Sequence, residues 1–251
     1  MRLSDMTSDD VRDVVRRQPD DGTLRPLVLV PIGSTEQHGP HLPLRTDTLI
    51  AEEIAGRAVS QTDGLVVGPS LAVTASGEHA GFAGTLSIGN DVLTQVIVEL
   101  VRSADWAAGV VLVNAHGGNV VALKRAVDQL TGERRADGFR RRVLSWAPRW
   151  PTRADGGPPD LHAGRIETSL MLAIDPGLVR LELAVAGPDT PLDDLLPALR
   201  SNGVREVSPN GVLGDPAGAS GAEGERFINQ FVDHLVHTIE RWRPVDPTPT
   251  D

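Results

Sequence analysis

Short apolar runs alternate along the chain with longer amphipathic segments, and this pattern predicts two kinds of element. Runs such as LRPLVLVPI and GVVLVNA are almost wholly apolar, which is typical of strands buried on both faces of a sheet. The segments between them space their apolar residues three or four positions apart, as helices do. The pattern predicts strands at 24–32, 64–71, 109–115 and 139–147, and helices at 46–60, 90–107, 119–132 and 163–175. Ser220 and Glu223 make a capping box that opens a final helix. This alternation indicates an α/β fold with a mostly parallel central sheet covered by helices on both faces.

The loops and the chain end complete this organisation. The stretches 148–160 and 208–221 are rich in proline and glycine, and we interpret them as long working loops inside one domain. No repeat, heptad or low-complexity block interrupts the pattern. We expect a single domain over residues 1–242 and a disordered tail at 243–251.

The composition restricts the chemistry more than the fold. The 251 residues carry a net charge of −10, which argues against a nucleic acid or an anionic membrane as partner. There is no cysteine, so any metal has to be held by His, Asp and Glu, and the single lysine, Lys124, gives little scope for Schiff-base chemistry. The start of the sequence lacks a signal-peptide layout, and no apolar run is long enough to span a bilayer. We expect a cytoplasmic protein.

The unusual polar residues gather in the loops that follow the predicted strands. STEQHGPHLPLRTD follows the first strand, SGEHAGF the second and NAHGGN the third, and DLHAGRIET follows the fourth after a loop. Ligands of an open parallel sheet bind at the carboxyl ends of its strands, where these loops meet. Five of the seven histidines lie in them: His38, His41, His79, His116 and His162. The pattern predicts one site at this edge of the sheet.

Carboxylates accompany these histidines. Glu36 and His38 are two positions apart, so in an extended loop they project to the same side. Asp47 either joins them, bridging two metals, or caps the helix that begins there. His116 ends a buried strand, as a metal ligand or as a structural group. Glu167 falls inside the apolar stripe of its helix, where a carboxylate is costly unless it is paired or binds a metal.

Oxygen and nitrogen donors of this kind suit a pair of divalent ions such as Zn, Mn or Fe(II). Two such ions bridge a water, lower its pKa toward about 7 and polarise a carbonyl. The predicted reaction is therefore hydrolysis of an amide or a related C–N bond. Two other classes stay open: a metal-binding module without catalysis, and a flavodoxin-like nucleotide-binding protein, although no GxGxxG or P-loop follows the first strand.

The motifs GSTEQHGPHLPLRTD, SGEHAGFAGTLSIG, NAHGGN and HAGRIETS together resemble the creatininase family of metal-dependent amidohydrolases. The resemblance implies a three-layer α/β/α fold, a homo-oligomer and a dinuclear site. Its implied metal ligands are Glu36, His38, Asp47, His116 and Glu167, with His162 as the catalytic, proton-transferring histidine. Creatininase has a Glu two positions after the third-strand histidine, where this sequence has Gly118, so Glu167 should take over and creatinine is a doubtful substrate.

Within the family, the stretch REVSPNGVLGDPAGAS is most similar to the members that release a C-terminal Val-Tyr-derived unit from a small modified precursor peptide. The alternative is a formamide hydrolase acting on a formylamino-pyrimidine. We expect Glu78, His79 and Asn119 to contact the substrate. Further candidate contacts are Trp146, Trp150, Arg45 and Arg165, each with an ordinary packing or surface role as the competing interpretation.

Overall fold

The computed structural model describes residues 1–16, 25–136, 138, 140–151, 160–188 and 190–242. At its centre is a four-stranded sheet in the order β2-β1-β3-β4. Its strands are β1 (Leu27–Ile32), β2 (Leu65–Val67), β3 (Gly109–Asn114) and β4 (Val143–Trp146). Every pairing in this sheet is parallel, and Leu27 lies beside both Leu65 and Gly109. The predicted α/β fold with a parallel sheet is confirmed.

Alternate residues of each strand point into two different cores. Leu27 and Leu29 of β1 belong to one buried cluster, whereas Val28 and Val30 belong to the other. Because both faces of the sheet are apolar, each needs its own helical layer. This is the physical reason for the uninterrupted apolar runs in the sequence.

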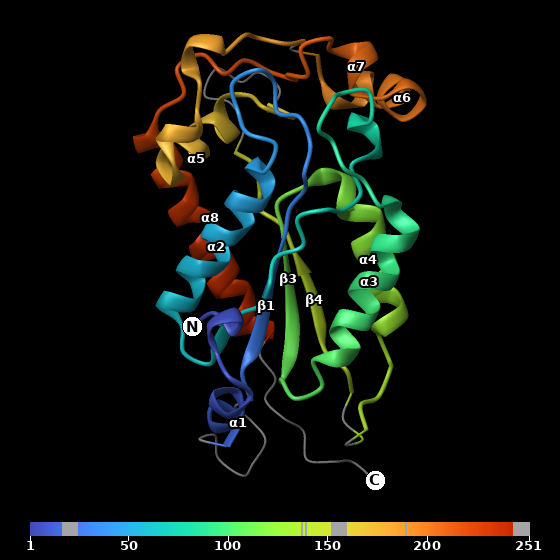
Figure 1. Cartoon of the computed structure of the whole chain (residues 1–251), viewed down its shortest axis with the longest axis vertical. Coiled ribbons are helices and arrows are strands. Elements are labelled where there is room, and N and C mark those ends of the chain that lie inside the picture. Colours follow the sequence, from blue (N-terminus) through green and yellow to red (C-terminus); the bar gives the residue numbers. More distant parts are fainter. Residues whose placement is uncertain (17–24, 137, 139, 152–159, 189, 243–251) are drawn as a thin grey trace.

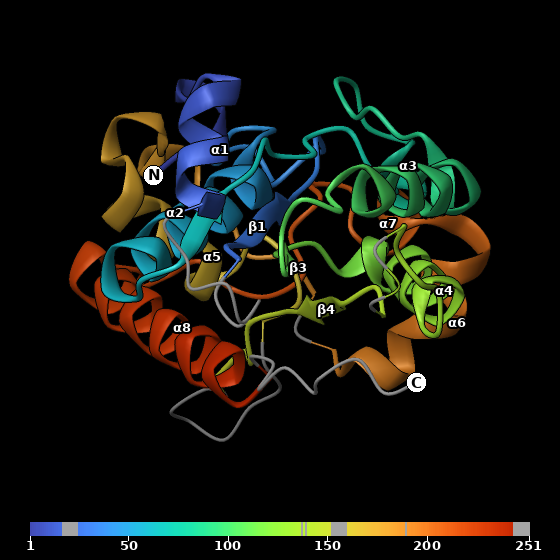
Figure 2. The same cartoon turned by 90° about the horizontal axis from the view of Figure 1, so that it is seen from below.

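Figures 1 and 2 show helices on both sides of the sheet. On one side α2 (Thr46–Gln61), α5 (Arg165–Ile174) and α8 (Gly221–Trp242) pack together, and we call them the α2/α5/α8 layer. On the other side α3 (Gly89–Ser103) packs against α4 (Val120–Leu130), and we call these two the α3/α4 layer. The three-layer arrangement implied by the family resemblance is therefore present.

Some predicted elements are shorter in the structure. β2 ends at Val67 rather than at residue 71, because Gly68 and then Pro69 follow, and proline has no N–H to donate to a strand ladder. Beyond them, Leu71 makes only an isolated bridge with Ile32. β4 and α3 are shorter than predicted as well, whereas the loop 208–220 contains no helix or strand. The predicted loop 148–160 and the tail 243–251 fall largely or wholly outside the described residues.

Three helices were not predicted: α1 (Ser8–Arg16), α6 (Leu192–Asn202) and α7 (Val204–Val207). α6 and α7 pack against Gly77–His79, so they flank the loop after β2. In Figure 1 they lie at the top with the loops that follow the strands, and α1 lies at the opposite end. Short 3-10 helices occupy Leu3–Asp5, Gly77–His79, Gly117–Asn119, Pro176–Leu178 and Leu181–Leu183. Among the described residues, no helix combines the length and the apolarity needed to cross a membrane.

Candidate metal centre

The loop after β1 runs directly into α2, and Gly33 allows the two to approach closely. A Cβ at Gly33 would lie 2.3 Å from the backbone N of Thr48, so only glycine fits there. This close approach brings the first turn of α2 against the strand end and buries Asp47, which accepts a hydrogen bond from Ser34 Oγ at 2.8 Å. The helix N-cap is Arg45, so the capping role considered for Asp47 is excluded.

One group of possible metal ligands consists of Glu36, Asp47 and His116. His116 Nε2 lies 3.2 Å from Glu36 Oε2, and His116 Nδ1 lies 3.1 Å from Asp47 Oδ2. His116 follows β3, and its Nε2 also lies 3.0 Å from the Ala75 carbonyl oxygen. All three ligand side chains are buried.

A second group consists of His38, Asp47 and Glu167. His38 Nε2 lies 2.9 Å from Asp47 Oδ1 and 4.0 Å from Glu167 Oε2. Glu167 stands in the first turn of α5, and its Oε2 accepts a hydrogen bond from the N–H of Ala163 at 2.6 Å. Ala163 has a φ of 52°, the left-handed region that a non-glycine residue rarely adopts. Asp47 therefore lies between the two groups, with one carboxylate oxygen toward each.

His162 joins a third group with Glu36 and His38. Its Nδ1 lies 3.8 Å from Glu36 Oε1, and its ring centroid is 4.3 Å from that of His38. The sequence assigned His162 to proton transfer and not to metal binding. In the structure, Nδ1 of His162 is close enough to Glu36 and His38 either to bind a metal or to transfer a proton.

The charges of this cluster are strongly coupled. Burial lowers the pKa of His38, but the carboxylates of Asp47, Glu167 and Glu36 outweigh burial and raise it to about 9. Burial raises the pKa of Glu167 to about 7. Burial and the neighbouring charge of His38 lower the pKa of His162 well below its usual value and that of His79 to about 3. Without a cation, protons on some of the imidazoles therefore balance the carboxylates.

The surroundings of the Glu36 carboxylate indicate whether this cluster can bind metal ions. It is fully buried, and neither of its oxygens accepts a hydrogen bond from the described residues. Such a carboxylate costs several kcal/mol unless a charge or a metal compensates it. Among the possible ligands, His116 Nε2 lies 3.2 Å from Glu36 Oε2, and His38 Nε2 lies 2.9 Å from Asp47 Oδ1. Two ligands that each lie about 2.0–2.2 Å from one ion are about 3 Å apart, so the residues fit divalent cations.

Glu78 and His79 lie where the sequence expected substrate contacts, beside the cluster. The side chain of Glu78 is 34% exposed, and its Oε1 is 3.7 Å from His116 Nε2. A Cβ at Gly118 would lie only 2.3 Å from Glu78 Oε1, so the carboxylate of Glu78 occupies the space that a side chain at 118 would need. The same Cβ would lie 2.4 Å from the backbone carbonyl oxygen of Ala75, so a side chain at 118 does not fit unless that loop moves.

Asn119, a third expected substrate contact, lies deeper than Glu78 and His79. Its side chain is fully buried, and its amide joins three loops. Nδ2 donates to the Gly33 carbonyl and to Asn114 Oδ1, while Oδ1 accepts from the N–H of Ala75. Asn119 is therefore a structural residue beneath the site.

The remaining candidate substrate contacts are two arginines and two tryptophans outside the ligand cluster. Arg165 forms an ion pair with Glu223, with Nε 2.8 Å from the carboxylate, so its guanidinium is already engaged. Arg45 is exposed at the start of α2. The tryptophans pack against α8: the Trp146 indole donates to His234 Nδ1 at 3.1 Å, and Trp150 makes an edge contact with Phe231. The packing interpretation thus holds for both tryptophans.

Two further residues of the site, Gln37 and His41, were given no role from the sequence. Both are buried beside the ligands. His41 Nε2 lies 2.9 Å from Thr168 Oγ1 and so links the loop after β1 to α5. Gln37 contacts two histidines at once. Their place within STEQHGPH was the only available signal.

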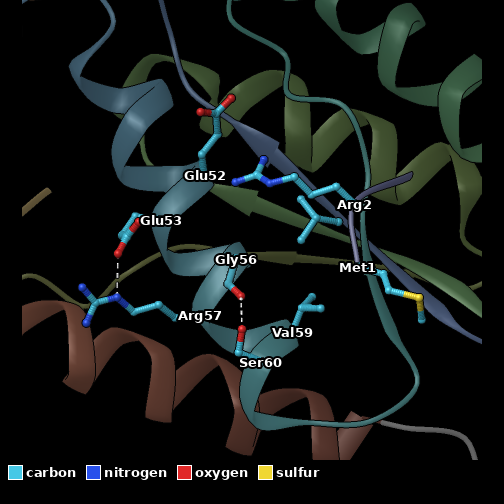
Figure 3. Close-up of a pocket in the computed structure, with 9 residues that line it drawn as sticks. Met1, Arg2, Glu52, Glu53, Gly56, Arg57, Val59 and Ser60 are labelled. Atoms are coloured by element: carbon cyan, nitrogen blue, oxygen red, sulfur yellow. Dashed lines mark hydrogen bonds and ion pairs between the residues drawn. The ribbon is translucent and has the colours of Figure 1, made fainter. Parts of the chain in front are cut away.

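A separate surface hollow lies between the first residues of the chain and α2 (Figure 3). Two of its charged side chains pair with each other, since Arg57 Nε donates to Glu53 at 2.6 Å, and Arg57 also pairs with Glu225. The three groups of possible metal ligands in the described residues all lie elsewhere. The hollow gives no indication of a ligand.

The chain is similar to several known proteins. A mycofactocin precursor peptide peptidase from Mycolicibacterium smegmatis is 48% identical over 225 residues, covering 87% of this chain and 86% of the relative. A crystal structure of creatinine amidohydrolase (creatininase) is similar with a TM-score of 0.76 at 25% identity, covering 98% of both chains. A structure described as "Creatininase Mn" has a TM-score of 0.75 at 25% identity and covers 96% of this chain and 98% of its own. The family model "Creatininase: Creatinine amidohydrolase" matches residues 4–239, and the chain therefore belongs to the creatininase family.

Proposed function

We propose that this protein is a metal-dependent peptidase that cleaves the mycofactocin precursor peptide. The observation that supports the catalytic part is the buried Glu36 carboxylate. It accepts no hydrogen bond from the described residues and lies beside the imidazoles of His79 and His116. The choice of substrate is supported by the 48% identity to the peptidase from Mycolicibacterium smegmatis over most of both chains. It agrees with the peptide substrate expected from the sequence motifs.

We assign five residues as ligands of two divalent ions. Glu36, Asp47 and His116 would hold one ion, and His38, Asp47 and Glu167 the other. Zn, Mn and Fe(II) all suit such donors, and manganese accompanies a related creatininase structure. When bound, such a pair lowers the pKa of a water and polarises the carbonyl to be attacked.

His162 is assigned the proton transfer. Its ring lies between those of His38 and His79, with centroids 4.3 and 4.5 Å away. Burial and the charge of His38 keep its pKa well below the usual value, so the ring is neutral and can take up a proton. It would then deliver that proton to the departing amine, which cannot leave as an anion.

The substrate is expected to approach past Glu78, whose side chain is more exposed than those of the ligands. A free peptide carboxylate needs a cation in a protein of net charge −10. Arg45 is the better candidate because Arg165 is paired with Glu223. The homo-oligomeric state stays a prediction.

The test is to incubate the metal-loaded protein with a peptide ending in Val-Tyr, with the same peptide amidated, and with a formylamino-pyrimidine. Mass spectrometry then identifies the products. Release of the terminal unit from the peptide, or from its modified form, supports the proposal. Turnover of the formylamino-pyrimidine alone would replace it with the formamide hydrolase.

A further inference from the structure

Gln37 lies between two proposed ligands in the sequence, yet its side chain is turned toward other partners. It is buried, at 5% exposure. Its amide nitrogen is 2.9 Å from His79 Nδ1, 3.1 Å from His162 Nε2 and 3.0 Å from the Gly211 carbonyl oxygen. Its Oε1 accepts a hydrogen bond from the N–H of Gly39 at 2.9 Å. A backbone N–H can only donate, so this contact fixes which end of the amide is oxygen.

The amide nitrogen has two hydrogens and three neighbours, so one neighbour receives none. His162 Nε2 also lies 2.7 Å from the backbone carbonyl oxygen of Gln37, which can only accept. His162 Nε2 must therefore carry a hydrogen, and it cannot accept one from the amide as well. The two amide hydrogens go to His79 Nδ1 and to the Gly211 carbonyl.

This count assigns both tautomers. His162 carries its proton on Nε2, which leaves the lone pair of Nδ1 on the side of Glu36, 3.8 Å from Oε1. His79 accepts at Nδ1, so its proton is on Nε2, the nitrogen 3.3 Å from Glu36. In each ring the nitrogen nearer to Glu36 thus has a defined protonation state.

The loop that includes Gly211 packs directly against the side-chain amide of Gln37. A Cβ at Gly211 would lie 1.8 Å from Gln37 Oε1, and its φ of +83° is one that L side chains rarely adopt. Leu213 of the same loop bridges to His162. Gln37 therefore joins the loop after β1 to the loop 208–214 and to both histidines.

We propose that Gln37 is a positioning residue for the reaction: its side chain sets the tautomer of His79, and its backbone carbonyl sets that of His162. The inference rests on the proposed function for its catalytic meaning, because only a substrate gives the tautomers a use. The tautomers themselves can be measured without any substrate.

The test uses Gln37→Glu, which keeps the shape but cannot donate, and Gln37→Met, which keeps much of the volume without any hydrogen bond. Nitrogen-15 NMR of histidine-labelled, zinc-loaded protein reads the tautomers. In Gln37→Glu the His79 proton should move from Nε2 to Nδ1, whereas His162 should keep its proton on Nε2 because the backbone carbonyl is unchanged. Gln61→Glu makes the same chemical change at an exposed position of α2 and is the matched control.

Both variants at position 37 should retain about two metal ions per chain and lose about 10–100-fold in kcat, the usual range for groups that orient a metal site. An unchanged His79 tautomer in Gln37→Glu, or a wild-type kcat in Gln37→Met, would overturn the proposal. If the wild type cleaves no peptide, the proposed substrate fails, but the NMR result still decides the role of Gln37. If the NMR expectation fails while peptide is cleaved, only the role of Gln37 is lost.

Discussion

The two helical layers are packed alike but take part in the site very differently. Leu170 of the α2/α5/α8 layer and Leu93 of the α3/α4 layer are both fully buried. The first turns of α2 and α5 nevertheless also bury polar residues, namely Thr46, Asp47, Thr48, Glu167, Thr168 and Ser169. In α3 and α4 the buried polar residue is Thr94. The α2/α5/α8 layer thus supplies two proposed ligands, whereas the α3/α4 layer only packs against the other face of the sheet.

The sharpest way to break this comparison is to neutralise one acidic residue in each layer. Asp47→Asn should reduce the metal content from about two ions per chain to less than one and bring activity to background, because Asp47 contacts both ligand groups. Asp91→Asn in α3 should leave both unchanged, since that carboxylate is exposed and pairs only with Arg125 among the described residues. Elemental analysis and peptide cleavage measure the two outcomes.

Glu167→Gln should lower the metal content less than Asp47→Asn does. Glu167 belongs to one group that includes Asp47 and not to the other, so this variant should keep its fold and lose one ion. Full metal content in Glu167→Gln would show that the proposed ligand set is wrong at this position.

The next effect in size concerns His162, which precedes α5. His162→Ala should lower kcat by about 10²–10⁴, the range for removing a general acid–base group, with metal content unchanged. His237→Ala, at an exposed position of α8, is the control and should behave as the wild type. Loss of an ion from His162→Ala would instead identify His162 as a ligand in the group with Glu36 and His38.

The smallest effect on activity is expected from the cores of the two layers. Leu170→Ala and Leu93→Ala should each lower the free energy of unfolding by about 2–5 kcal/mol, as usual for buried leucines. Only Leu170→Ala should also weaken metal binding, by about tenfold. The truncation leaves a cavity beside α5, and α5 carries Glu167, so a shift of this helix would displace a proposed ligand. Denaturant titrations and metal titrations of both variants check this. Equal metal affinities would mean that the layers do not differ in how they support the site.

The sequence allows good prediction where the signal is local. The apolar spacing of α2 predicts its bounds to within one residue, and the apolar runs predict where the four strands lie along the chain. The N-terminal helix α1 was missed although Thr7 and Asp10 cap it reciprocally, at 2.8 and 3.2 Å. Most of its nine residues are charged or polar and none is buried, so no apolar run marks it in the sequence.

The site was predictable in part for the same reason. The proposed ligands stand out because charged and imidazole groups follow apolar strands. Gln37 did not stand out, because its partner Gly211 is 174 positions away and only the folded chain brings them together. For Asn119 the neighbouring His116 suggested a place at the open rim, whereas its amide is enclosed by three loops.

The glycine at position 118 also limits how this enzyme can evolve. A Cβ at 118 would meet the carboxylate of Glu78, but that carboxylate is the end of a flexible side chain and can move away. Even then the new Cβ would lie 2.4 Å from the Ala75 carbonyl oxygen, so the backbone of that loop has to shift as well. A creatininase-like glutamate at 118 therefore needs a movement of the loop after β2, and not the exchange of one side chain alone.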